Sequence, residues 1–336
     1  MKRLLILTTG GTIAGRGNDS AQLDHYTAGV IAGDELLKAV PQVQELAILQ
    51  LEQIANVDSA DLRLTHWRSL VERIREVFAE DSEVAGVVIT HGTNTLEETA
   101  WLLQLLIDDP RPIVLVGAMR PATALSADGP LNLLQAVQVA LSSAARGQGV
   151  LIVMDGQIHC AEAVTKSATQ GVGAFTSPGI GPLGWVDDAG VHLLYLVNRR
   201  PKPLAQLQLR DEWPQVAIVY GCVEPPAALI SALLMAEVQG MVFTGTGSGQ
   251  LSELEHSSLH SWKGPLPLML YSNRCGSGLV HNNEYQSRLG LLPAGRLNPQ
   301  KARVLLMLAL IAGFDRSGLA FLLQYSASVV SDFDLI

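Results

Sequence analysis

The chain has 336 residues, of which 48% are hydrophobic and 16% charged, a composition typical of a folded protein long enough for two domains. Its 23 basic and 32 acidic residues give a net charge of −9, and it contains no run rich in lysine and arginine. Nucleic acid is therefore not an expected partner. The three cysteines are far apart and the histidines show no metal-ligand spacing, so we expect neither disulfides nor a metal site.

The apolar runs are too short for a leader or a membrane span. Only Leu4 to Leu7 precede the first glycines, which is too short for a signal-peptide core, so a cytoplasmic protein without membrane contact is expected. The longest apolar run, Val304 to Phe314, has about eleven residues, whereas a spanning helix needs roughly 20. We interpret it as a core helix with Asn298 as N-cap and Pro299 at its first position.

Short apolar runs alternate with longer amphipathic ones along the first half of the chain, which predicts βαβ units and a mostly parallel sheet between two helix layers. The expected strands are Arg3–Thr8, Ala47–Ile54, Gly86–Thr90, Pro112–Val116 and Gly149–Met154. The expected helices are Gly33–Val40, Thr65–Ala79, Glu97–Ile107 and Leu131–Ser143. The fold class is therefore α/β, with a three-layer sandwich in the larger domain.

A polar, proline-bearing segment, Asn198 to Pro203, interrupts this pattern, and a second alternating series follows it. Strands of that series are expected at Val216–Val219, Met241–Phe243 and Leu266–Tyr271. We therefore predict a catalytic N-terminal α/β domain over 1–198, a linker over 199–211 and a smaller α/β C-terminal domain over 212–336.

Three loops after predicted strands carry hydroxyl groups. Thr8–Gly15 and His91–Glu98 each place threonines beside glycines, and Asn56–Asp61 follows the second strand. Because ligands bind outside the carboxyl ends of parallel strands, these loops are expected to form one pocket. A single threonine usually caps the local backbone, and no GxGxxG or P-loop spacing supports a nucleotide. A further glycine cluster, Gly245–Gly249, is interpreted as a tight turn.

Paired hydroxyls in such a pocket favour hydrolysis. A threonine hydroxyl is a weak nucleophile, so it needs a nearby base, and the carbonyl oxygen that it charges needs aimed donors. His91 is interpreted as a group that packs or hydrogen-bonds within its loop, not as that base.

Four blocks in order resemble the bacterial-type L-asparaginases, with motifs like those of type II members. They are the Thr8 and His91 segments, Gly117–Pro130 and Leu297–Arg303, and the resemblance extends over nearly the whole chain. It implies a cofactor-free amidohydrolase that converts L-asparagine to L-aspartate and ammonia. It also implies a homotetramer built as a dimer of dimers.

The resemblance implies a role for each matching residue. Thr12 would attack the side-chain amide, assisted by Tyr26 on a mobile loop that closes over the substrate, and Thr93 would pair with Lys166 as its base. Ser59 would hold the α-carboxylate, and backbone N–H groups near Thr12 and Thr93 would stabilise the oxyanion. The other implied substrate contacts are Gly11, Asp58, Gly92, Asn94 and, from a partner subunit, Glu284.

The chain departs from the family pattern at three positions. Asn94 stands where the family has an aspartate that binds the α-ammonium group, so slower turnover is expected. Ala60 replaces a glutamine or glutamate, and Gln250 replaces a partner-subunit asparagine, which leaves the choice between asparagine and glutamine open. A glutaminase-asparaginase and a catalytically weakened amino-acid-binding protein remain alternatives. The amidase subunit of a tRNA-dependent amidotransferase resembles an asparaginase but carries an additional domain before the catalytic threonine. This alternative is disfavoured, because the threonine is already reached at position 12 and no basic surface is evident.

Overall fold

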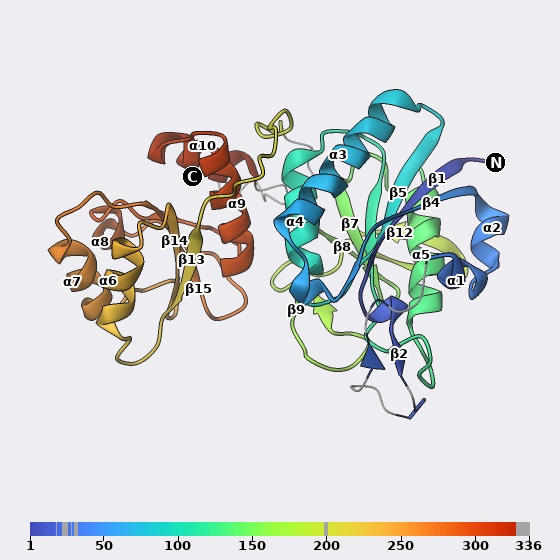
Figure 1. The fold of residues 1–336 in the computed structure, drawn as a ribbon, viewed down its shortest axis with the longest axis horizontal. Helices are drawn as coiled ribbons and strands as arrows, with labels where there is room; N and C mark the ends of the chain where they lie inside the picture. Colours follow the sequence, from blue (N-terminus) through green and yellow to red (C-terminus); the bar gives the residue numbers. More distant parts are fainter. Residues whose placement is uncertain (18, 22–25, 28, 30–32, 198–200, 327–336) are drawn as a thin grey trace. The chain divides into compact units, whose positions relative to one another are not determined.

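The computed structural model describes residues 1–17, 19–21, 26–27, 29, 33–197 and 201–326. These residues fall into two compact units, one before and one after residues 198–200 (Figure 1). The predicted linker 199–211 begins outside the described residues, as the final stretch 327–336 also does, and its role as a linker stays a prediction.

Over the described residues, the first unit contains an eight-stranded sheet in the order β12-β11-β8-β7-β6-β5-β1-β4. The five strands from β4 to β7 run parallel, as the alternating pattern predicted. Their bounds are Arg3–Gly10 (β1), Ile48–Val57 (β4), Val84–Thr90 (β5), Ile113–Val116 (β6) and Val150–Met154 (β7). Each overlaps the strand expected from the sequence.

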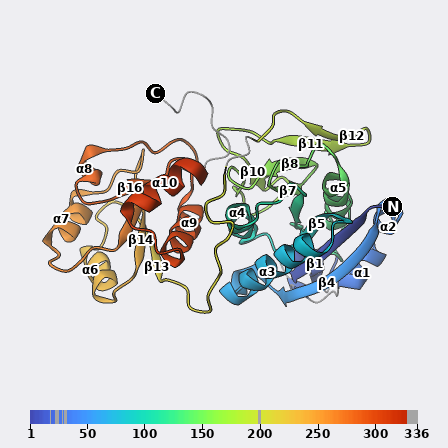
Figure 2. The same cartoon turned by 90° about the horizontal axis from the view of Figure 1, so that it is seen from above.

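Helices cover both faces of this sheet, which gives the predicted three layers (Figures 1 and 2). Their bounds are Gly33–Lys38 (α1), Gln42–Leu46 (α2), Leu64–Glu80 (α3), Leu96–Leu106 (α4) and Gly129–Leu141 (α5). In β1, Leu4 and Ile6 pack with residues of α2 and α5, whereas the alternate residues Leu5 and Leu7 are fully buried from the other face. This two-sided burial explains the continuous apolar run of the strand.

The strand order places a topological switch point at β1. The chain passes from β1 to β4 on one side and then to β5 on the other, so the connections after β1 and β5 leave in opposite directions. A crevice at the carboxyl ends of such strands is the usual ligand site of an open α/β sheet. The two threonine-bearing loops follow these two strands.

The antiparallel part of the sheet was not predicted. It consists of β8 (Gln157–Cys160), β11 (Gly184–Asp187) and β12 (Gly190–Leu193), which extend the sheet beyond β7. A separate antiparallel pair joins β9 (Thr165–Lys166) to β10 (Phe175–Thr176). These strands have four residues or fewer, too few to show a period in the sequence.

The second unit is a smaller parallel α/β sandwich. Its sheet has the order β13-β14-β15-β16, with bounds Val216–Tyr220, Gly240–Gly245, Leu268–Asn273 and Leu292–Pro293. Its helices are Ala227–Met235 (α6), Glu253–Ser261 (α7), Glu284–Ser287 (α8), Pro299–Ile311 (α9) and Arg316–Ser326 (α10). α6 and α7 share one core with the sheet, and α9 packs against β13, β14 and β15. Asn298 caps α9 as predicted, because its side chain accepts from the Lys301 N–H.

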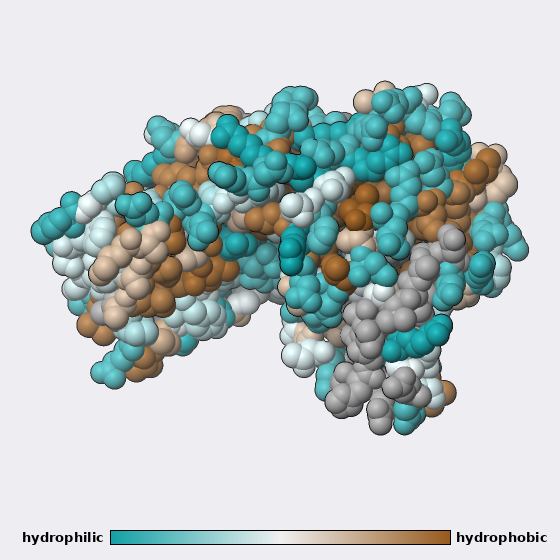
Figure 3. Space-filling model, viewed as in Figure 1, coloured by the Kyte–Doolittle hydropathy of each residue, from teal (hydrophilic) through white to brown (hydrophobic). Residues whose placement is uncertain are grey.

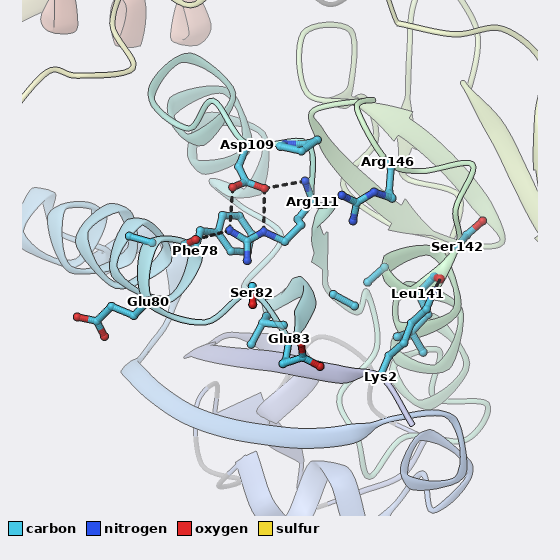
Figure 4. Close-up of a pocket in the computed structure, with 15 residues that line it drawn as sticks. Lys2, Phe78, Glu80, Ser82, Glu83, Asp109, Arg111, Leu141, Ser142 and Arg146 are labelled. Atoms are coloured by element: carbon cyan, nitrogen blue, oxygen red, sulfur yellow. Dashed lines mark hydrogen bonds and ion pairs between the residues drawn. The ribbon is translucent and has the colours of Figure 1, made fainter.

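A cavity of about 580 Å³ lies at the amino ends of the parallel strands, away from the threonine loops (Figure 4). One wall is tied together by Arg111, which donates to Asp109 at 2.8 Å and to the backbone carbonyls of Phe78 and Asp81. Its guanidinium carbon also stacks 4.0 Å from the centre of the Phe78 ring. Arg111 therefore fastens the start of β6 to the end of α3.

Among the described residues, no helix is both long and apolar enough to cross a bilayer. In the second unit, apolar side chains gather at the surface over α6 (Figure 3), where Leu229 and Met235 are exposed.

Candidate active site

The loop after β1 begins with a left-handed turn. Gly10 and Gly11 have φ values of 96° and 83°, which side chains rarely adopt, and the Gly11 N–H donates to the Val57 carbonyl at 3.0 Å. The chain then forms a short 3₁₀ turn over Thr12–Ala14, in which Thr12 is 6% exposed. The turn leaves Thr12 at the carboxyl end of β1, beside the loop after β4.

Three glycine and serine positions bring the three loops together. A Cβ atom added to Gly11 would lie 2.3 Å from the Gly92 Cα, so the first loop touches the loop after β5. A Cβ atom added to Gly92 would lie 2.6 Å from the Ser59 hydroxyl oxygen. The convergence predicted for these loops is therefore present, and it depends on the missing side chains at both glycines.

Hydrogen bonds join the Ser59 loop to the loop after β5. The Asn94 N–H donates to the Ser59 hydroxyl at 3.1 Å, and the Thr95 hydroxyl donates to the Ser59 carbonyl at 2.8 Å. The Asn94 side-chain amide donates to an Asp58 carboxylate oxygen at 3.3 Å. Asp58 in turn begins the 3₁₀ turn Ser59–Asp61 by accepting from the Ala60 N–H.

Lys166, at the end of β9, contacts the loop after β5. Its ammonium group donates to the Thr93 hydroxyl and to the Asn94 amide oxygen, each at 2.9 Å. Partial burial lowers the pKa of Lys166, and the charge of Asp58 opposes that shift only in part. A lysine with a lowered pKa in contact with a hydroxyl can accept that hydroxyl's proton.

His91 is fully buried behind this pair. Its Nδ1 lies 2.7 Å from the Gly92 carbonyl oxygen and its Nε2 lies 2.9 Å from the Thr99 hydroxyl. Burial lowers the pKa of His91 to about 4, so the ring is neutral at pH 7. The interpretation of His91 as a hydrogen-bonding group of its loop is confirmed.

The block Gly117–Pro130 holds the beginning of the first loop. The Ala122 N–H donates to the Gly15 carbonyl at 3.1 Å, and the Thr123 hydroxyl accepts from the Gly17 N–H at 2.9 Å. Asp128 fixes this block by accepting from the backbone N–H groups of Met119 and Arg120. The sequence did not reveal this contact, because the two segments are about a hundred residues apart.

The structure thus brings together the following predicted site residues: Gly11, Asp58, Ser59, Gly92, Thr93, Asn94 and Lys166, with Thr12 next to Gly11. The Tyr26 backbone pairs with Gly17 in a two-stranded ribbon of β2 (Arg16–Gly17) and β3 (Tyr26–Thr27), while residues 22–25 of the predicted mobile loop lie outside the described residues. Glu284 belongs to the second unit, where it pairs with Arg288 at 2.8 Å, and its role at the site stays a prediction.

Two other sequence interpretations concern regions away from this cluster. Gly245–Gly249 forms a tight turn closed by the Thr246 N–H and the Gln250 carbonyl at 2.9 Å, as expected. In the part of the chain that the structure describes, no group of three or more histidine, cysteine or carboxylate side chains could hold a metal ion.

The fold is that of a two-domain α/β protein, and a lysine in contact with a hydroxyl at the switch point of its larger parallel sheet is a candidate hydrolytic site. The family model "Asparaginase, N-terminal" matches residues 3–198, and "Glutaminase/Asparaginase C-terminal domain" matches residues 215–321. The chain belongs to the asparaginase family.

Relatives and a solved structure agree with this assignment. The chain is 39% identical to L-asparaginase 2 of Bacillus subtilis, over 92% of this chain and 83% of that protein. It is 38% identical to glutaminase-asparaginase of Acinetobacter glutaminasificans, over 91% of this chain and 94% of that protein. The crystal structure of a probable cytoplasmic L-asparaginase from Campylobacter jejuni superposes with a TM-score of 0.90 at 38% identity, covering 97% of this chain and 100% of that one.

Proposed function

We propose that this chain hydrolyses the side-chain amide of L-asparagine to L-aspartate and ammonia. The observation that carries the proposal is the 2.9 Å hydrogen bond between Lys166 and Thr93, beside the Gly11 turn that presents Thr12. The names of the relatives, L-asparaginase and glutaminase-asparaginase, support the same reaction.

In the proposed mechanism the Thr12 hydroxyl attacks the amide carbon of the substrate, with Tyr26 as its helper. The carbon–nitrogen bond of the amide breaks, and its nitrogen takes the proton lost by the hydroxyl and leaves as ammonia. An ester between Thr12 and the substrate acyl group remains. Water activated by the Thr93 and Lys166 pair then cleaves the ester and releases aspartate. Backbone N–H groups near Thr12 and Thr93 stabilise the oxyanion in both steps.

Substrate recognition in this proposal depends on the Ser59 loop. Ser59 holds the α-carboxylate, and Asp58 and Asn94 face the α-ammonium group. Asn94 has no charge and lies between Asp58 and Lys166, which supports the proposal that Asp58 supplies the carboxylate that binds the α-ammonium group. A neutral amide gives a weaker contact than the family's aspartate, so turnover is slowed.

A glutaminase-asparaginase is the second candidate. Ala60 replaces a longer side chain next to Ser59, which is compatible with a longer substrate, and the Acinetobacter relative bears that name. Gln250, which belongs to the second unit, stands where the family pattern has a partner-subunit asparagine and bears on the same preference.

We further propose a cytoplasmic homotetramer, arranged as a dimer of dimers. The exposed apolar residues over α6 support self-association, because such patches commonly mark protein interfaces. Light scattering of the purified chain tests the stoichiometry, and a monomer at micromolar concentration would contradict it.

The direct test is ammonia release from asparagine and from glutamine by the wild-type chain and by Thr12→Ala. Release by the wild type and none by Thr12→Ala is expected. If neither releases ammonia while asparagine still raises the melting temperature, the chain is a binding protein of this fold and the hydrolase proposal is wrong.

A further inference from the structure

A buried chain of hydrogen bonds runs behind the loop after β5. The Trp67 indole N–H donates to the Thr99 hydroxyl at 2.8 Å, and this hydroxyl lies 2.9 Å from the His91 Nε2. The His91 Nδ1 lies 2.7 Å from the Gly92 carbonyl oxygen. Trp67, His91 and Thr99 are all 5% exposed or less, so no bulk water competes for these bonds.

The chemistry of the groups in this chain sets the direction of its protons. A backbone carbonyl can only accept, so the His91 Nδ1 carries the proton that it donates to Gly92. Burial lowers the pKa of His91 to about 4, so the ring is neutral at pH 7 and its Nε2 carries no proton. The Nε2 therefore accepts from the Thr99 hydroxyl, which in turn accepts from the Trp67 indole N–H.

The bond to Gly92 orients the peptide unit that leads into Thr93. The chain has no cis peptide bond among the described residues, so the Thr93 N–H points away from the Gly92 carbonyl of the same plane. The carbonyl faces His91 on the buried side, and the N–H is therefore turned away from His91. Within the described chain this N–H has no hydrogen-bond partner, unlike the neighbouring His91 and Asn94 N–H groups.

We propose that His91 is a positioning residue, which aims the Thr93 N–H at the substrate oxyanion by holding the Gly92 carbonyl. His91 touches no substrate and transfers no proton in this role. The Gly92 carbonyl, which can only accept, by itself selects the tautomer with the proton on Nδ1, while Thr99 and Trp67 satisfy the other ring nitrogen and contribute to stability. The inference deepens the proposed function and rests on it, because the oxyanion belongs to the amide hydrolysis.

Three variants separate aiming from structural support. His91→Leu removes the bond to Gly92. His91→Asn places an amide N–H near the position of Nδ1 and can restore it. Thr99→Val breaks the same buried chain but leaves the bond to Gly92, and it therefore serves as the matched control for lost stability.

In His91→Leu we expect kcat for asparagine to fall about tenfold to 100-fold and KM to change less than about threefold. Removal of one oxyanion donor lowers kcat by about 10²–10³-fold, and a donor that points in the wrong direction loses part of that contribution. His91→Asn is expected to recover at least half of that loss on a logarithmic scale. Thr99→Val is expected to lower the melting temperature as much as His91→Leu but to keep kcat within about threefold of the wild type. Equal losses of kcat in His91→Leu and Thr99→Val would overturn the proposal.

A crystal structure of His91→Leu gives a readout that does not depend on turnover. The Gly92 to Thr93 peptide plane is expected to rotate when its anchor is lost, whereas an unchanged plane would refute the positioning role. If the wild-type chain releases no ammonia, the proposed function fails, while this crystal structure still decides whether His91 holds the peptide.

Discussion

The charge beside the proposed place of the substrate's α-ammonium group gives the sharpest prediction. Asn94 donates to Asp58 at 3.3 Å and accepts from Lys166 at 2.9 Å, so a carboxylate at either position 58 or 94 would lie in the same small region. The wild-type chain has one such carboxylate. Asn94→Asp has two, Asp58→Asn has none, and the double variant again has one, moved to the other side.

A charge-assisted contact is stronger than a neutral hydrogen bond by about 1–2 kcal/mol, or roughly tenfold in kcat/KM. We therefore expect Asn94→Asp to raise kcat/KM for asparagine about tenfold and Asp58→Asn to lower it about tenfold. The double variant is expected within about threefold of the wild type, because the two effects oppose each other. Steady-state ammonia release from all four proteins measures the cycle.

Two results would refute this reasoning. If Asn94→Asp stays within twofold of the wild type, Asn94 does not limit the enzyme. If the double variant is as slow as Asp58→Asn, Asp58 acts through something other than its charge, such as the bond that begins the Ser59 turn. In that case a crystal structure of Asp58→Asn or Asp58→Glu would show that the loop around Ser59 is displaced.

Three further predictions concern pH, packing and stability. Burial lowers the pKa of Lys166, so kcat is expected to rise with pH through that lowered pKa and to be lost at lower pH as the amine is protonated; a kcat that rises in acid would contradict its role as a base. Gly11→Ala is expected to abolish activity, because an added Cβ atom would collide with the Gly92 backbone. The control is Gly171→Ala, since Gly171 has the same φ of 83° but open space around it; this variant is expected to lose only about 1–2 kcal/mol of stability in urea unfolding and to keep its kcat. Equal effects of the two variants would exclude a specific role for the close contact between the loops. Arg111→Ala is expected to lower the free energy of unfolding by about 2–4 kcal/mol, because two backbone carbonyls and Asp109 lose their donor. Burial raises the pKa of Asp109, but its hydrogen bonds with Arg111 lower that pKa by more, so the net shift is downward. The stabilisation by this pair is therefore present above the pKa of the unfolded state and is lost as pH falls through the pKa of the folded state. Urea unfolding at several pH values measures this, and a difference between wild type and Arg111→Ala that does not change with pH would contradict the reasoning.

Four of the five parallel strands, β1, β5, β6 and β7, were predictable because both of their faces are buried, whereas few residues of the edge strand β4 are buried. In β1 the run from Leu4 to Leu7 is almost fully buried and forms a short apolar run in the sequence, and α3 shows a clear apolar face. The antiparallel strands β8, β11 and β12 were not predicted, because four residues are too few for alternation to be distinguished from a loop.

The glycines and threonines of the site were predictable because they follow the strands whose carboxyl ends form the crevice. The contact of Asp58 with Asn94 was not, because it joins loops 36 residues apart and depends on the register of β4, β1 and β5. Thr99 was also missed, although it lies one turn after Thr95 on α4, a spacing that places both on one helix face. Only the structure reveals that one of these hydroxyls supports Ser59 and the other supports His91.

The switch point explains why the site tolerates so little bulk. The loops after β1 and β5 leave the sheet in opposite directions, so they meet only at their first residues, where Gly11 and Gly92 touch. Any side chain there would separate the backbone that leads to Thr12 from the backbone that leads to Thr93. Lys166 and His91 contact neighbouring groups of the same loop: Lys166 contacts the Thr93 hydroxyl, and His91 contacts the carbonyl of the peptide before Thr93. In the proposed mechanism one threonine presents a hydroxyl to its base and an N–H to the substrate only while both supports are in place. Loss of either support is therefore expected to affect kcat more than binding.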